Sequence, residues 1–249
     1  MTRTRTATAT ATATVAAALL LLLAGCGDSE SEDPGGSGGS GGEQGGEDGE
    51  NTGQADPGPE CVGEADPTGT RALFGGETEL PGGGTLSYAA ASSDGTDRQA
   101  DLTQGGDTTT LSLDDQLTVQ GNDWTVSQIC TYRVILTPAD QALAQDPDAV
   151  ETDPEWPITQ GGFWELHTGI TDDRPDPPLS VAVTSIDEDP ATASIQLNAE
   201  GANLASYDDT PIGATVEIAD QLWEIADITA ETDADPATVR LQPLGPAVP

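Results

Sequence analysis

The sequence predicts an all-β protein in which two tandem small antiparallel β-sandwich or barrel modules follow a disordered tether. After Cys61, short runs of β-branched, aromatic and leucine residues alternate with turn residues at the spacing of strands. The two halves of this region share an ordered set of motifs, and the segment before it lacks large apolar side chains. These observations divide the 249-residue chain into a signal peptide at 1–25, a tether at 26–60, modules at 61–138 and 162–245, and a linker at 139–161.

The N-terminus has the order of a secretory signal, with arginines before an apolar run at 15–24. That run is about half as long as a membrane span. The junction Leu23-Ala24-Gly25-Cys26 resembles the lipobox of bacterial lipoproteins. The resemblance implies that Cys26 carries a diacylglyceryl group on its sulfur and anchors the mature chain to the extracytoplasmic face of the membrane. An ordinary secretory signal with an incidental cysteine is the alternative.

The tether at 26–60 is rich in Gly, Ser, Asp and Glu and has no Val, Leu, Ile, Phe, Tyr or Trp. Such a composition cannot offset the entropy lost on ordering, so we expect a flexible spacer. A Thr-Ala-rich start, this tether and the absence of Lys together resemble actinobacterial cell-surface lipoproteins. This resemblance is compositional and implies no site beyond Cys26.

Charge excludes several classes of function. The chain has 44 acidic residues against 7 arginines and no lysine, which gives a formal net charge of −37. Nucleic-acid binding needs clustered cations, so we expect no nucleic-acid partner. The expected partners are the membrane, through the lipid on Cys26, and a glycan or protein of the cell envelope. Absence of Lys also removes Schiff-base chemistry, and we expect no cofactor.

The two halves of the folded region resemble one another, which suggests a duplicated module. Trp124 and Trp223 occur at equivalent places, and we expect both indoles to be buried. The alternatives are two unrelated β domains, or one sheet with generic strand patterns. In order along the chain, 86–92 parallels 179–185, 118–119 parallels 215–216, 124–129 parallels 223–228, and 134–138 parallels 238–243.

Each module contains about seven predicted strands. A helical turn is expected between the modules, because Thr137, Pro138 and Asp140 have the order of a helix start that would continue to Gln145. The predicted strands lie at 70–74, 85–90, 99–104, 108–113, 117–120, 123–130 and 132–137, and then at 163–167, 179–185, 193–197, 204–207, 214–218, 222–228 and 238–242.

Two cysteines remain besides Cys26. In an exported chain, Cys61 and Cys130 are expected to form a disulfide, and two free thiols are the alternative. A zinc site needs three or four Cys or His ligands, and His167 is the one histidine, so we expect no metal site. Weak calcium binding by surface acids stays open.

Together these features favour a binding or interaction protein rather than an enzyme. Trp156, Phe163 and Trp164 are candidate ligand-binding residues, because an exposed row of aromatic rings on one sheet face would suit a glycan. A structural envelope protein without a small ligand is the first alternative. A glycan or peptide hydrolase, with His167 beside two carboxylates, is the second.

Overall fold

A computed structural model describes residues 60–92, 97–147, 156–232 and 235–247. The predicted signal peptide, Cys26, nearly all of the tether and part of the linker lie outside these ranges. Within them the secondary structure consists of β-strands and short 3-10 turns, without any α-helix, so the all-β prediction is confirmed. All described residues belong to one compact unit.

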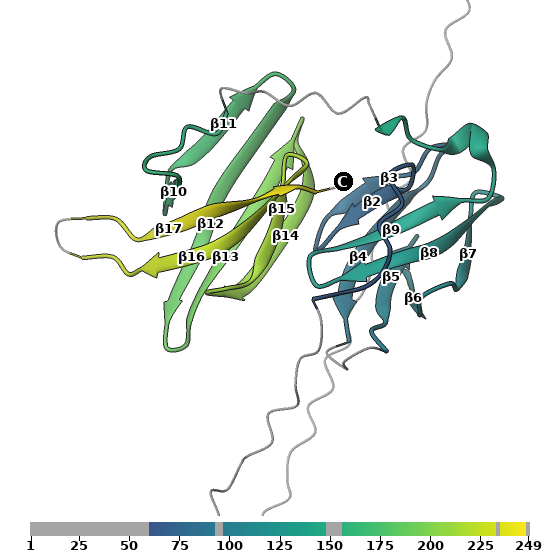
Figure 1. Cartoon of the computed structure of the whole chain (residues 1–249), viewed down its shortest axis with the longest axis horizontal. Coiled ribbons are helices and arrows are strands. Elements are labelled where there is room, and N and C mark those ends of the chain that lie inside the picture. Colours follow the sequence, from purple (N-terminus) through teal and green to yellow (C-terminus); the bar gives the residue numbers. More distant parts are fainter. Residues whose placement is uncertain (1–59, 93–96, 148–155, 233–234, 248–249) are drawn as a thin grey trace, which may run out of the picture. The chain divides into compact units, whose positions relative to one another are not determined.

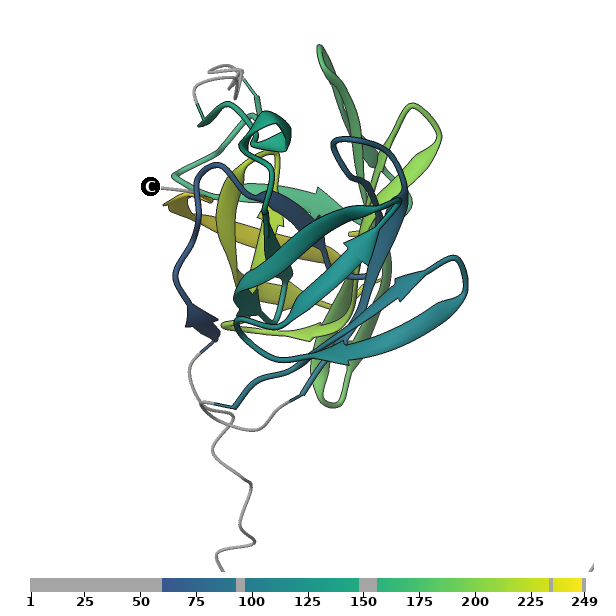
Figure 2. The ribbon, with the colours of Figure 1, turned by 90° about the vertical axis from the view of Figure 1, so that its right-hand side faces the viewer.

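Two antiparallel sheets make up the first module (Figure 1 and Figure 2). Its strands are β1 (Cys61–Gly63), β2 (Thr70–Leu73), β3 (Glu77–Glu79), β4 (Thr85–Ala91), β5 (Ala100–Gln104), β6 (Asp107–Leu111), β7 (Gln116–Val119), β8 (Asn122–Cys130) and β9 (Arg133–Pro138). One sheet has the order β3-β4-β5-β6. The other has the order β2-β9-β8, and β1 and β7 pair with opposite ends of β8. Buried side chains from both sheets, among them Tyr88, Trp124 and Leu136, form the core between them.

The second module repeats this arrangement. Its strands are β10 (Trp164–His167), β11 (Thr171–Pro175), β12 (Pro178–Glu188), β13 (Ala191–Ala199), β14 (Ala202–Pro211), β15 (Thr215–Ile218), β16 (Gln221–Thr229) and β17 (Thr238–Pro246). The sheets have the orders β11-β12-β13-β14 and β10-β17-β16-β15. Each strand from β2 to β9 therefore has a counterpart eight strands later, with the same neighbours.

The two tryptophans at the centre of the sequence repeat occupy equivalent places, as predicted. Trp124 is 1% exposed and Trp223 is 2% exposed. Across the ladder, Trp124 faces Pro138 and Trp223 faces Pro243, and in both modules the ladder shifts register after the second residue beyond the tryptophan. This shared irregularity is stronger support for a repeated module than strand periodicity, because a β-bulge is a specific local feature.

Strand β12 is the counterpart of β4 in the second module, but the residue-by-residue alignment of the two strands differs by two residues from the one that the sequence motifs suggested. Tyr88 bridges Phe74 after β2, and Val183 bridges Thr168 after β10, so Tyr88 corresponds to Val183. The sequence motifs had placed it opposite Val181. Strands β12 and β13 have 11 and 9 residues, whereas β4 and β5 have 7 and 5, and this extension displaced the match.

Three strands and one cap were not predicted correctly. Strands β1, β3 and β11 are short edge strands, and β3 and β11 carry mainly polar side chains because backbone pairing rather than burial defines them. The expected helix start at Thr137 is wrong, since Thr137 and Pro138 end β9. Asp140 instead caps a 3-10 helix at Gln141–Leu143, where its carboxylate accepts from the Ala142 amide.

The modules share buried structure. Cys130 and Tyr132 of the first module belong to the hydrophobic core of the second. The loop after β2 also follows the edge of β14, where the Ser206 amide donates to the Phe74 carbonyl at 2.8 Å. Close approach of the two backbones requires glycine, because a Cβ on Gly76 would lie 1.9 Å from the carbonyl oxygen of Leu204.

We therefore expect Gly76→Ala to lower the free energy of unfolding by about 1–3 kcal/mol, the range for overpacking a closed site. Denaturant unfolding of the full chain measures this change. Gly121→Asn is the control, because Gly121 has open space around it and a positive φ that Asn tolerates. If Gly76→Ala were no more destabilising than Gly121→Asn, this contact between the modules would be wrong.

Candidate functional site

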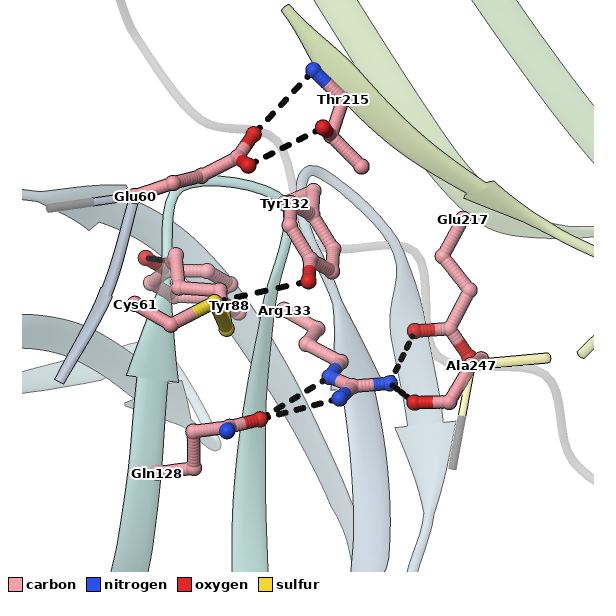
Figure 3. The surroundings of a disulfide bond; sticks show 10 residues. Glu60, Cys61, Tyr88, Gln128, Tyr132, Arg133, Thr215, Glu217 and Ala247 are labelled. Carbon is pink, nitrogen blue, oxygen red and sulfur yellow. Dashed lines mark hydrogen bonds and ion pairs between the residues drawn. A yellow bond between two sulfur atoms is a disulfide. The ribbon is translucent and has the colours of Figure 1, made fainter. Parts of the chain in front are cut away.

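A disulfide marks the first-module side of the contact between the modules. Cys61 of β1 and Cys130 of β8 are bonded, with their Cα atoms 4.0 Å apart, so the predicted pairing is confirmed. The bond holds β1 on β8, and Glu60 precedes β1 directly. Both carboxylate oxygens of Glu60 accept hydrogen bonds from Thr215 of β15, from its amide at 3.1 Å and its hydroxyl at 3.0 Å (Figure 3).

A buried ion-pair network lies next to this contact (Figure 3). Glu217 of β15 has a side chain that is 3% exposed, and its two oxygens accept from Arg133 at 2.9 Å and from Arg71 at 2.9 Å. Arg71 also pairs with Asp220. Both arginines belong to the first module and both acids to the second, so the network joins the modules.

Most of the polar atoms in this network have hydrogen-bond partners. Arg133 uses its remaining donors on the side-chain oxygen of Gln128, at 2.9 and 3.3 Å, and on the carbonyl of Ala247. Burial raises the pKa of the Glu217 carboxyl, and the guanidinium groups of Arg71 and Arg133 oppose that rise. Compared with apolar residues of similar volume, a buried ion pair of this kind contributes little net stability. Removal of one partner, however, leaves the other as an unpaired buried charge.

Glu217→Leu should therefore lower the free energy of unfolding by about 3–5 kcal/mol, because it leaves the 3% exposed Arg133 side chain without its carboxylate. The control is Glu165→Gln, which removes the carboxylate from the half-exposed pair of Glu165 and Arg240. An exposed pair is worth about 0–1 kcal/mol. If urea unfolding showed that the two substitutions lower the free energy of unfolding equally, the buried ion-pair network would not be what holds the modules together.

All three tyrosines of the chain are buried, and each hydroxyl has a partner. Tyr88 donates to the Cys130 carbonyl at 2.7 Å, Tyr207 donates to the Glu217 carbonyl at 2.9 Å, and the Tyr132 hydroxyl lies 3.4 Å from the Cys61 sulfur. Burial raises the pKa of Tyr132 to about 12 and raises those of Tyr88 and Tyr207 further.

The raised pKa values predict that no tyrosine of the folded chain ionises near pH 10, which is the usual pKa of tyrosine in an unfolded chain. Since each folded pKa is the higher one, the folded chain keeps protons that the unfolded chain releases. The stability that these groups contribute is complete below about pH 10 and is lost as pH rises through the folded values. Tyrosinate absorbance should therefore stay flat to about pH 11 in the native protein and rise near pH 10 in denaturant. A native rise near pH 10 would contradict the burial.

A pocket of about 590 Å³ lies where the connection from β14 to β15 meets the first module. Its volume is within the range of small-molecule sites, which is about 300–1,000 Å³. The lining is mostly apolar, with charged groups at a few positions. It comprises the aromatic residues Phe74, Tyr132 and Tyr207, the aliphatic residues Pro211, Ile212 and Ala214, the acids Glu60, Asp208 and Asp209, and also Arg98, Thr131, Thr210, Gly213 and Thr215.

The aromatic residues proposed from the sequence as a ligand platform do not form an exposed row. Trp164 is 1% exposed, and its ring packs edge-on against Trp156 with centroids 5.0 Å apart. Both indole N–H groups donate to Asp172, at 3.1 Å from Trp156 and 2.6 Å from Trp164. The ring of Phe163 is covered by the guanidinium of Arg240 at 4.3 Å. Trp164 belongs to the core of the second module and Trp156 packs against that core, while Asp172 accepts a hydrogen bond from each indole.

The residues considered for catalysis are held by structural contacts. His167 lies in β10, and its Nδ1 is 3.1 Å from the hydroxyl of Thr238. The adjacent acids Asp172 and Asp173 have different partners, since Asp173 accepts from Ser180 at 2.5 Å while Asp172 binds the indoles. In the described ranges, no three His, Cys, Asp or Glu side chains gather where they could hold a metal ion. The expectation that the chain is not an enzyme stays a prediction.

Sequence reasoning missed the network and the pocket. Glu217 stands between Val216 and Ile218, and strand alternation would place an acid there on the solvent face. The sequence did offer one signal for the network. The chain has only seven basic residues, all arginines, and two of them, Arg71 and Arg133, lie in predicted strands rather than in loops.

We compared the chain with protein-family models, with curated proteins and with solved structures, and none of the three comparisons found a match. Within the part of the chain that the structure describes, no helix has the length and apolar character of a membrane span.

Proposed function

We propose that this protein is a lipid-anchored binding protein on the extracytoplasmic face of the cell membrane, with its ligand site in the pocket between the two modules. The anchor is supported by the lipobox-like junction at Cys26, and an oxidising location is supported by the disulfide between Cys61 and Cys130. The single observation that carries the binding role is the pocket of about 590 Å³, mostly apolar and bounded by both modules.

Two features of the pocket favour a binding role. Its first-module lining, at Glu60 and Tyr132, is fixed by the disulfide-held strand β1 and by the shared core. Its second-module lining includes Ile212, which is 49% exposed on the connection after β14. An exposed isoleucine beside buried aromatic rings offers apolar area that a ligand would remove from water.

The alternative is a structural envelope-associated lipoprotein without a small ligand. The buried network around Glu217 favours it, since a spacer needs its modules fixed to one another. A hydrolase is the third possibility, and the contacts of His167 with Thr238 give it no particular support.

The anchor is tested with Cys26→Ala. We expect the variant to leave the membrane fraction of the producing cells, because acylation needs the thiol. Cys61→Ala is the control, since it removes a cysteine that is bonded in the fold, and it should stay with the membrane. A Cys26→Ala variant that fractionates with the membrane like the wild type would contradict the anchor.

The binding role is tested with 2-phenylethanol, a neutral aromatic probe small enough for the pocket. We expect millimolar binding by the full chain, seen as concentration-dependent NMR shifts of Ile212 and Ala214. Ala214→Phe should abolish the shifts of Ile212 by filling the pocket. Ala202→Phe, at the start of β14 and not in the pocket lining, should leave them unchanged. If the wild type shows no shifts with the alcohol or with a charged analogue of it, the pocket is not a ligand site and the structural alternative is favoured.

A further inference from the structure

We infer that the pocket between the modules takes an organic cation, an ammonium group carried on an apolar body. This inference rests on the proposed function, in which that pocket is the binding site. It adds the charge and the chemical class of the ligand. Both are inferred by asking which charged groups of the lining already have partners within the protein.

The acidic lining residues exceed the basic ones. Glu60, Asp208 and Asp209 line the pocket, and Arg98 is the one basic residue in its lining. Arg98 is 4% exposed and donates to the Ser92 carbonyl at 3.2 Å, so its guanidinium is directed to the protein's own acceptor. An ammonium group of a ligand would therefore meet a net negative lining.

The three carboxylates differ in how they are used. Glu60 has each oxygen bonded once to Thr215, and a carboxylate oxygen can accept more than one hydrogen bond. Asp208 and Asp209 are exposed on β14, and within the described residues neither side chain has a hydrogen bond or ion pair. These two carboxylates are available for a charge-assisted hydrogen bond to a ligand.

The rest of the lining suits the apolar body of such a ligand. Phe74, Tyr132 and Tyr207 supply aromatic rings, and Pro211 and Ile212 supply aliphatic surface. The hydroxyls of Tyr132 and Tyr207 are bonded elsewhere, to Cys61 and to the Glu217 backbone, so these residues contribute their rings. Aromatic rings attract cations through their negative faces, most strongly where water is displaced.

An anionic ligand would find no comparable partner. The chain has no lysine, and each of the five described arginines contacts an acceptor or ring of the protein itself. The formal net charge of −37 also attracts small cations and repels anions over the distance that salt leaves unscreened, about 8 Å at physiological ionic strength.

The test compares three probes that share a phenylethyl group, on the full chain, by calorimetry or NMR titration. These are 2-phenylethylamine as the cation, 2-phenylethanol as the neutral form and 3-phenylpropionate as the anion. We expect the amine to bind at least about tenfold more tightly than the alcohol, the anion to bind most weakly, and the preference to shrink as salt is raised. In Asp208→Asn/Asp209→Asn the amine should bind no more tightly than the alcohol. The control Asp187→Asn/Glu188→Gln, which removes the same charge from β12, should keep the preference.

The outcomes separate the two claims. Amine and alcohol bound equally by the wild type would overturn the cation inference and leave the pocket as a binding site. An amine preference that survives Asp208→Asn/Asp209→Asn, or that the control removes as well, would also overturn it, because the preference would then come from net charge alone. If neither probe shifts Ile212 or Ala214, the binding role and the inference both fail.

Discussion

Glu217 lies buried between two arginines of the other module, and the way the two β-sandwiches fit together depends on that placement. An acid with a side chain 3% exposed needs compensating charge, and Arg71 and Arg133 supply it from β2 and β9. The strand that carries Glu217 also presents Thr215 to Glu60. One four-residue strand, β15, therefore provides two of the polar contacts that join the modules, and the pocket lies beside it.

The site arises from the differences between two otherwise equivalent modules. Among the described residues, strand β1 and its disulfide have no counterpart in the second module, and they bring Glu60 to the junction. Strand β14 of the second module has 10 residues, whereas its counterpart β6 has 5. The end of β14 and the connection that follows it form one side of the pocket. Trp164 corresponds in position to Thr70, since these residues face Leu241 and Leu136 across equivalent ladders. The second module thus has a larger aromatic core, and the first supplies the cations.

Sequence reasoning succeeded where local pattern determines structure. Most of the strands, the repeat around Trp124 and Trp223, and the pairing of Cys61 with Cys130 follow from alternation, turn residues and cysteine number. It failed where partners distant in the chain decide. Trp164 looked like a surface platform because its burial depends on Asp172 and on the neighbouring ring of Trp223. Glu217 looked like a solvated acid because its arginines lie 84 and 146 residues away.

The central claim is that these shared buried contacts make the two modules one cooperative unit. Differential scanning calorimetry of the full chain tests it most directly, since a two-state unit has equal calorimetric and van't Hoff enthalpies. We expect a single transition in which the two enthalpies agree. Two resolved transitions, or a calorimetric enthalpy about twice the van't Hoff value, would show that the modules unfold independently and would contradict the claim.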